Sequence, residues 1–268
     1  MNIFTVILTQ PLANGLVLFY RILGQNMGLA IIGFSFFLRL ILSPLTKPYL
    51  ESMKKMREVA PQLEKIKTKH KDDKTKLMKA QADFYKEKGI NPSAGCLPQI
   101  LQIVVLIALY NVFNNALGSG GIVTHNFNAL LYSPLKFLEG AKINTQFLYL
   151  NISKPDVINL GLPFAIPGPF LILAALSQMI SAKIASPYLE LEEKIAQKTK
   201  GKEDDFQVAM QNSAIYTFPL MTILIGVRFP SGLALYWLLF SLFQTYQQYK
   251  STGWGGLTPW LKRLNLLK

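Results

Sequence analysis

Apolar residues along the chain gather into blocks that are long enough to cross a lipid bilayer. A helix rises about 1.5 Å per residue, so roughly 20 apolar residues span a hydrocarbon core of about 30 Å. Only the tripeptide Pro-Ser-Gly at 230–232 separates the last two blocks, which predicts a tight turn between antiparallel helices. The pattern therefore predicts an all-α membrane protein with five transmembrane helices. The predicted spans are 27–46, 97–117, 164–185, 212–229 and 232–250.

Residues 1–26 form a further apolar segment, which Gln10 and Pro11 interrupt. Proline suits the first turn of a helix, and apolar residues recur on one helical face after it. We expect an interfacial helix lying on the outer membrane surface, and a sixth span that starts in the cytoplasm is the alternative. With no basic residue ahead of its apolar part and no small-residue cleavage site, the segment is a poor signal peptide.

The segment 47–96 is charged, yet its apolar residues recur three and four positions apart in two runs. The polar stretch His-Lys-Asp-Asp at 70–73 separates these runs. Two short helices that fold back on each other would bury both runs, which predicts a helical hairpin. A solvated charged connector is the alternative. The candidate core residues of the hairpin are Met53, Met56, Leu63, Leu77 and Phe84.

Basic residues are distributed unevenly among the connections between the spans. Of the 28 lysines and arginines, 13 lie in 47–98, five in 183–210 and four from Lys250 onward, whereas the 118–163 loop contains three. The positive-inside rule places the hairpin 47–96, the connection 186–211 and the tail 251–268 in the cytoplasm. The 118–163 loop is then extracytoplasmic. The net charge of +13 therefore indicates membrane topology, and we expect no specificity for nucleic acid.

The sequence contains few residues suited to metal or catalytic chemistry. Cys96 is the only cysteine, so an intrachain disulfide and a thiolate metal site are excluded. His70 and His125 lie in separate polar segments. Neither a Ser/His/Asp arrangement nor a phosphate-binding glycine motif occurs. We expect no metal, no cofactor and no enzymatic activity.

Arg39 lies inside the first predicted span, where an arginine costs about 2.5–3.5 kcal/mol on insertion scales. Its side chain could extend toward the basic interface at Lys47, about 12 Å away by helical rise. Alternatively it faces a water-filled cavity, because Ser35 lies on the same face and no predicted span core contains an aspartate or glutamate. Further polar residues inside the predicted spans include Gln102, Gln178 and Gln244.

Four sequence blocks together resemble the YidC family of membrane protein insertases. They are QPLANGLVLFYRILG, GLAIIGFSFFLRLILSPLTK, NPSAGCLPQ and FPSGLALYWLLFSLFQTYQQY, and they occur in order within 9–250. The chain is similar to short members without a large extracytoplasmic domain. The resemblance implies a hydrophilic groove, open to the cytoplasm and to lipid. Its implied groove residues are Arg39, Ser35, Gln102, Gln178 and Gln244.

The resemblance also implies how the groove works. Arg39 would attract acidic residues of a client protein, while the client's apolar segment slides along Tyr236 and Trp237 at the lipid-facing side. Trp237 stands where relatives commonly have tyrosine, which leaves a phenolic hydrogen bond there in doubt. The implied function is an insertase and chaperone for membrane proteins that uses no nucleotide. Two alternatives stay open, a small anionic-solute transporter with a cationic site and a scaffold for membrane protein assembly.

The expected partners are client membrane proteins and the lipid bilayer. The Sec translocon, the ribosome and a targeting receptor are further candidates. The expected location is a bacterial plasma membrane with the C-terminus in the cytoplasm, and an organellar member without its transit peptide is the alternative.

Overall fold

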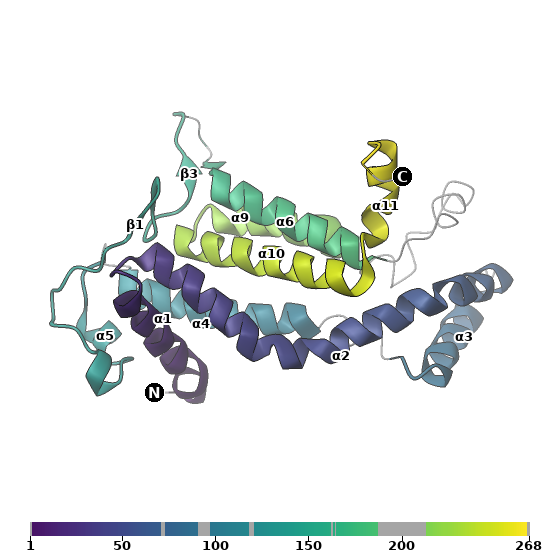
Figure 1. Cartoon of the computed structure of the whole chain (residues 1–268), viewed down its shortest axis with the longest axis horizontal. Coiled ribbons are helices and arrows are strands. Elements are labelled where there is room, and N and C mark those ends of the chain that lie inside the picture. Colours follow the sequence, from purple (N-terminus) through teal and green to yellow (C-terminus); the bar gives the residue numbers. More distant parts are fainter. Residues whose placement is uncertain are drawn as a thin grey trace.

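The computed structural model describes residues 2–70, 73–90, 97–117, 121–161, 163, 165–186 and 213–266. Within these residues the structure is mostly helical, and several helices lie side by side in an elongated bundle (Figure 1). Most of the predicted connection 186–211 lies outside the described residues. Among the described residues, Met27–Met56 is long and apolar enough to cross a membrane, and three shorter apolar helices are Ile100–Ala116, Pro169–Ala185 and Ser213–Gly226. The number of spans therefore stays a prediction.

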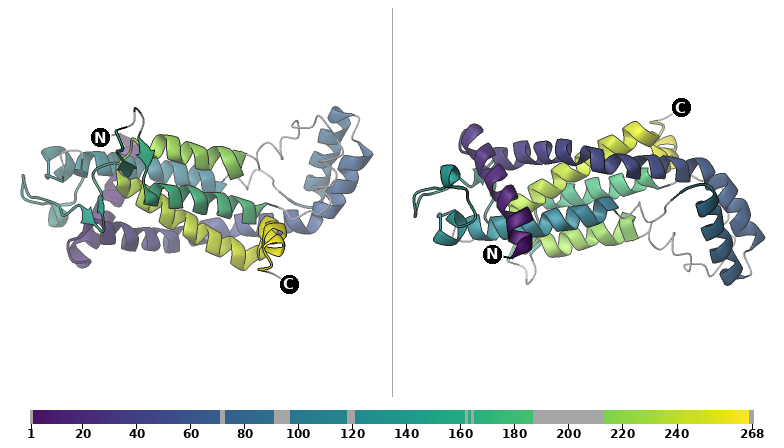
Figure 2. Two further views of the ribbon diagram at one scale, coloured as in Figure 1. Left: turned by 90° about the horizontal axis from the view of Figure 1, so that it is seen from above. Right: turned by 90° about the horizontal axis from the view of Figure 1, so that it is seen from below.

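The N-terminal segment is helical and lies across the bundle. A short π-helix, η1 (Thr5–Thr9), continues into α1 (Gln10–Ile22), which has Pro11 in its first turn. Figure 2 shows α1 crossing α2 and α4 at a steep angle, whereas the bundle helices run along the long axis. One face of α1, including Leu16 and Val17, is buried in the core. This direction supports the interfacial interpretation, which stays a prediction because no membrane is present.

The first predicted span and the first hairpin helix form one continuous helix, α2 (Met27–Lys69). The sequence predicted separate elements, 27–46 and 47–96, because the chain changes from apolar to charged there. Pro44 and Pro48 lie inside α2 at this junction. A proline inside a helix removes one hydrogen bond and produces a bend, but it does not end a helix that is supported by packing. Figure 1 shows that α2 changes direction partway along its length. At its start, Asn26 Oδ1 accepts a hydrogen bond from the Leu29 amide at 3.1 Å.

The hairpin projects away from the bundle at the far end of α2 (Figure 1). Helix α3 (Lys74–Glu87) folds back on α2, and Asp73 caps it by accepting a hydrogen bond from the Lys76 amide at 3.0 Å. Leu77 is half-buried, and the Met53 side chain lies outside what the structure describes. Two predicted runs of apolar residues thus meet in one small core. This core contains Leu63, Phe84, Tyr85 and Ile90, with Met56, Val59 and Ile66 packed against it.

Four further helices complete the bundle. They are α4 (Leu97–Leu117), α6 (Pro169–Ala185), α9 (Phe218–Gly226) with the preceding π-helix η4 (Ser213–Thr217), and α10 (Ser231–Thr252). Helix α10 packs against both α6 and α2. The sequence predicted a helix from residue 164, but α6 begins at Pro169. The reason is that Ile166 and Pro167 pair as a strand with Val157 and Ile158.

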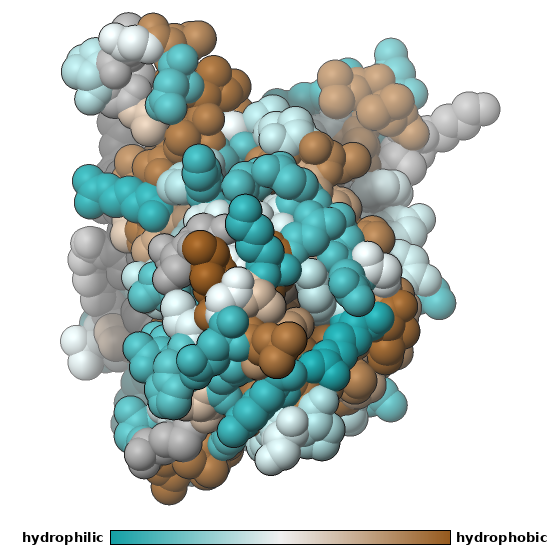
Figure 3. Space-filling model, turned by 90° about the vertical axis from the view of Figure 1, so that its left-hand side faces the viewer, coloured by the Kyte–Doolittle hydropathy of each residue, from teal (hydrophilic) through white to brown (hydrophobic). Residues whose placement is uncertain are grey.

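Residues 121–161, 163 and 165–168 form a cap over the end of the bundle at which α2, α6 and α10 begin (Figure 1). The hydrogen bonds that attach it there include Met27 N to Asn144 O at 3.0 Å, Leu171 N to Asp156 Oδ2 at 2.9 Å, and Ser231 N to Lys154 O at 2.7 Å. Figure 3 looks onto this end and shows hydrophilic side chains across much of its surface. The cap contains α5 (His125–Asn128), η3 (Ser133–Leu135), β1 (Gln146–Phe147), β2 (Leu150–Asn151), β3 (Val157–Ile158) and β4 (Ile166–Pro167).

The main core joins the cap to the helices. Ile152 of the cap is fully buried and packs into the same cluster as Leu16 of α1, Phe113 of α4 and Leu233 of α10.

At the opposite end, η5 (Gly255–Leu257) and α11 (Thr258–Arg263) follow α10. The Lys183 ammonium lies 5.4 Å from the centre of the Trp260 ring, which holds α11 near α6.

Candidate functional site: a polar cluster around Arg39

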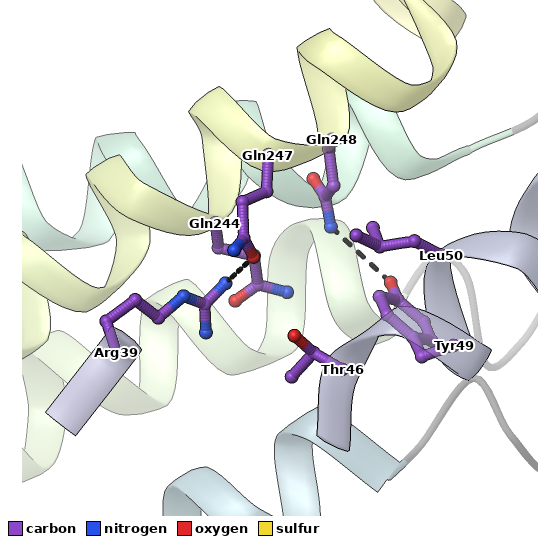
Figure 4. Close-up of a pocket in the computed structure, with 7 residues that line it drawn as sticks. All are labelled: Arg39, Thr46, Tyr49, Leu50, Gln244, Gln247 and Gln248. Atoms are coloured by element: carbon purple, nitrogen blue, oxygen red, sulfur yellow. Dashed lines mark hydrogen bonds between the residues drawn. The ribbon is translucent and has the colours of Figure 1, made fainter. Parts of the chain in front are cut away.

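Arg39 lies on α2 and extends toward α10 (Figure 4). Its Nη2 donates a hydrogen bond to Gln247 Oε1. The guanidinium carbon lies 5.0 Å from the centre of the Phe240 ring, a distance typical of a cation–π contact. Nε is buried and has no hydrogen-bond partner among the residues that the structure describes. The guanidinium is therefore held by one neutral acceptor and one ring face.

A small cavity lies beside this guanidinium. Within the described part of the chain its lining comes from α2 and α10, and most lining residues on each helix recur three, four or seven positions apart, which places them on one side of that helix. The lining is mostly neutral and polar. Its residues are Arg39, Thr46, Tyr49, Leu50, Gln244, Gln247 and Gln248.

A buried polar network continues from this cavity into α6. Ser181 Oγ donates to Gln248 Oε1 at 2.9 Å, and Gln248 Nε2 lies 3.4 Å from the Tyr49 hydroxyl oxygen. All three side chains are buried. A buried polar group is costly unless it is hydrogen-bonded, so this network favours one relative arrangement of α2, α6 and α10.

The structure brings together two of the five predicted groove residues, Arg39 and Gln244. Ser35 does not line the cavity, because its hydroxyl is buried and donates to Ile31 O of its own helix at 2.6 Å. Gln178 accepts a hydrogen bond from Thr222 Oγ1 at 2.8 Å, between α6 and α9. Gln102 is buried in α4, and its Nε2 has no partner within the described part of the chain. A groove that includes all five residues stays a prediction.

The two aromatic residues predicted to contact a client are both buried. Tyr236 lies in the main core, with its ring centre 6.2 Å from that of Phe240. Trp237 packs in a separate small cluster with Ala174 and Leu238. In this arrangement an apolar client segment reaches either ring only if α10 separates from its neighbours. Their role in client contact therefore stays a prediction.

The sequence interpretation missed Gln247, Gln248, Tyr49 and Thr46 at the cavity. Their spacing was available, since Gln247 follows Gln244 by three positions and Thr46 follows Arg39 by seven. The sequence alone does not specify that these faces of α2 and α10 point toward each other.

The chemistry of the cavity suits an anion. None of its lining residues is acidic, and its one charged group is the Arg39 guanidinium. Within the described residues, no group of three or more histidine, cysteine, aspartate or glutamate side chains is arranged to hold a metal ion. A carboxylate is therefore a better match for the cavity than a cation.

Comparison with known proteins agrees with the sequence motifs. Residues 18–253 match the family described as 60Kd inner membrane protein. The membrane protein insertase YidC of Fusobacterium nucleatum is 32% identical over 224 residues, which are 84% of this chain and 85% of that protein. The insertase of the same name from Pelobacter propionicus is 32% identical over 248 residues, but this chain spans only 38% of its length. A third, from Caulobacter vibrioides, is 45% identical over 104 residues, which are 39% of this chain and 17% of that protein.

The family match covers most of the chain, and it includes α2 with Arg39 as well as α10 with Gln247. The Fusobacterium relative is matched over most of both lengths. This chain belongs to the YidC family, the family of the 60Kd inner membrane protein.

Proposed function

We propose that this chain inserts client membrane proteins into the bilayer and helps them fold, with Arg39 as the attachment point for acidic residues of the client. The observation that supports this most directly is the state of the guanidinium. It is partly buried, it is surrounded by amides and hydroxyls, and no carboxylate lines its cavity. A partly buried guanidinium that has no carboxylate partner of its own attracts an anionic group from a client protein.

The proposed driving force needs no nucleotide. Burial of an apolar client segment in lipid is favourable by about 25 cal/mol per Å² of apolar surface. Where a membrane potential exists, each charge that crosses it contributes about 2.3 kcal/mol per 100 mV. The role of Arg39 is then to lower the barrier for the polar, acidic part of the client.

The proposed arrangement in the membrane has five spanning helices, with α1 and the cap on the outer side. The hairpin and the C-terminus lie in the cytoplasm, as the basic residues of these segments favour. The hairpin is a defined folded element, which supports a role in receiving clients or in binding a ribosome, a targeting receptor or the Sec translocon. Tyr236 and Trp237 are proposed to contact the client's apolar segment after α10 moves.

The test is insertion of a single-span client with an acidic outside tail into liposomes. The liposomes carry wild type, Arg39→Lys or Arg39→Ala, and insertion is scored by protease protection of the tail. We expect lysine to retain most insertion and alanine to lose it. A matched client with a neutral tail should insert equally well in all three. Equal insertion of the acidic client by the alanine variant contradicts the electrostatic step.

The same liposomes test the transporter alternative. Uptake of a labelled small anion in the absence of any client supports a transporter. We expect no uptake above that of liposomes without protein.

A further inference from the structure

Gln247 holds Arg39 at the edge that a carboxylate would use. Nε and Nη2 lie on one edge of a guanidinium and can together donate two parallel hydrogen bonds to a carboxylate. In this structure, Nη2 donates to the Gln247 amide oxygen, while Nε is buried and has no partner among the described residues. The Gln247 amide oxygen thus satisfies only Nη2 on this edge of the guanidinium. The two oxygens of a carboxylate would satisfy both Nη2 and Nε.

The Phe240 ring, which also contacts the Arg39 guanidinium, does not compete with an anion for its hydrogen-bond donors. Phe240 lies one helical turn before Gln244 and two turns before Gln247, so all three face α2. The Phe240 ring contacts the guanidinium through its face and takes none of the hydrogen-bond donors. An anion can therefore replace the Gln247 oxygen while the guanidinium stays in place. The cavity beside Arg39 adds the Gln244 amide on the same side (Figure 4), whereas the Thr46 hydroxyl already donates to Ser43 O at 2.9 Å.

We propose that Gln247 is a resting acceptor in the client-binding site, whose amide oxygen occupies Arg39 at rest and is exchanged for the carboxylate of an acidic client. The inference rests on the proposed function and deepens it. A client carboxylate accepts two parallel hydrogen bonds, from Nε and Nη2, and adds the attraction of opposite charges, so it displaces the single amide acceptor. A neutral polar segment cannot displace it with comparable gain. Gln247 thereby competes with an acidic client for Arg39, whereas a neutral-tail client, which does not use Arg39, inserts independently of it.

The test compares two single-span clients that differ only in an acidic or neutral outside tail, inserted into liposomes that carry the full chain. The readout is the ratio of acidic-tail to neutral-tail insertion for each variant. Gln247→Glu places a permanent carboxylate at the edge, and we expect the ratio to fall about tenfold. Gln247→Leu removes the competing acceptor, and we expect the ratio to rise by about threefold. Ser251→Glu is the matched control, because it adds the same charge one turn farther along α10, and its ratio should stay within about twofold of wild type.

Two results overturn the proposal. One is a Gln247→Glu ratio equal to that of Ser251→Glu, because the carboxylate would then not block Arg39. The other is a Gln247→Leu ratio that is unchanged or lower. The leucine variant therefore tests the proposal by itself, even if the glutamate variant fails to fold and inserts neither client.

Arg39→Ala, measured in parallel, separates this inference from the proposed function. If the alanine variant lowers the ratio but neither Gln247 variant changes it, only the role of Gln247 is wrong. If the alanine variant leaves the ratio unchanged, the electrostatic step of the proposed function fails as well. In the Arg39→Ala background, Gln247→Glu should lower the ratio no further.

Discussion

Asp156 of the cap accepts a hydrogen bond from the backbone amide of Leu171 in the first turn of α6, at 2.9 Å. Its other carboxylate oxygen lies 3.2 Å from the Tyr149 hydroxyl, and its backbone oxygen accepts from the Gly168 amide at 2.8 Å. A buried carboxylate at a helix N-terminus satisfies free amides and is favoured by the helix dipole. The cap therefore contributes the N-terminal end group of a bundle helix.

We expect Asp156→Ala to destabilise the protein by about 1–3 kcal/mol, because it leaves the Leu171 amide without its buried acceptor. Asp156→Asn retains an acceptor oxygen and should lose less. Thermal unfolding of the detergent-solubilised protein, followed by circular dichroism, measures both. Equal melting of the alanine variant and wild type would show that the Asp156 carboxylate does not stabilise the start of α6. Asp83→Ala, on the exposed surface of α3, is a control for loss of an acidic residue.

Gly28 allows the cap to pack directly on α2. A Cβ atom at this position would overlap the Phe147 ring of β1. We expect Gly28→Val to destabilise the protein by about 1–3 kcal/mol through overpacking. Phe147→Ala in the same chain should relieve much of this effect, because it removes the overlapping ring.

A double-mutant cycle of Gly28→Val and Phe147→Ala measures this coupling. Strictly additive effects would mean that the contact does not form. Gly24→Val is unsuitable as a control because that glycine has a positive φ of 70°.

The hairpin core predicts a separation between local folding and bundle stability. Phe84→Ala should unfold the hairpin, since removing a buried phenylalanine costs about 3–5 kcal/mol. The control is Met78→Ala, because Met78 is 69% exposed on the same helix. Hydrogen–deuterium exchange of α3 and of α6 reports the two regions separately. We expect faster exchange in α3 only, and equal acceleration in α6 would show that the hairpin is part of the bundle's cooperative unit.

Asp73 makes the hairpin sensitive to acid. The Lys76 backbone amide, with a further contribution from its ammonium group, holds the pKa of the Asp73 carboxyl below its usual value. A carboxyl whose folded-state pKa is lowered contributes stability above its unfolded-state pKa, about 3.9, and this contribution disappears as the pH falls through the folded-state pKa. We expect protection of α3 against exchange, corrected for intrinsic rates, to stay constant above about pH 5 and to fall as the pH is lowered through about 3.9 and below. Asp73→Asn keeps a capping oxygen without a charge and should show a smaller decrease. An identical decrease in both would assign the effect to other carboxyls.

The periodicity of the sequence determined most helices and the hairpin, because apolar spacing along one chain segment reports the face that the segment buries. Of the predicted core residues, Met56, Leu63 and Phe84 pack in the hairpin core, whereas Leu77 is not part of this cluster and the sequence did not predict Tyr85 and Ile90 there. Composition also identified Arg39 as a cation without an acidic neighbour in the predicted spans. These properties are local, so neighbouring residues are sufficient to predict them.

Only the tertiary structure decided which groups meet Arg39. Gln247 lies 208 positions away, and its contact depends on how α2 and α10 are rotated about their axes, which local spacing does not specify. The same applies to Ser35, whose hydroxyl bonds within its own helix, and to Tyr236, which is buried in the core. The cap is a further case: its segment has no long apolar period, and its order comes from hydrogen bonds to helix ends such as that between Asp156 and Leu171.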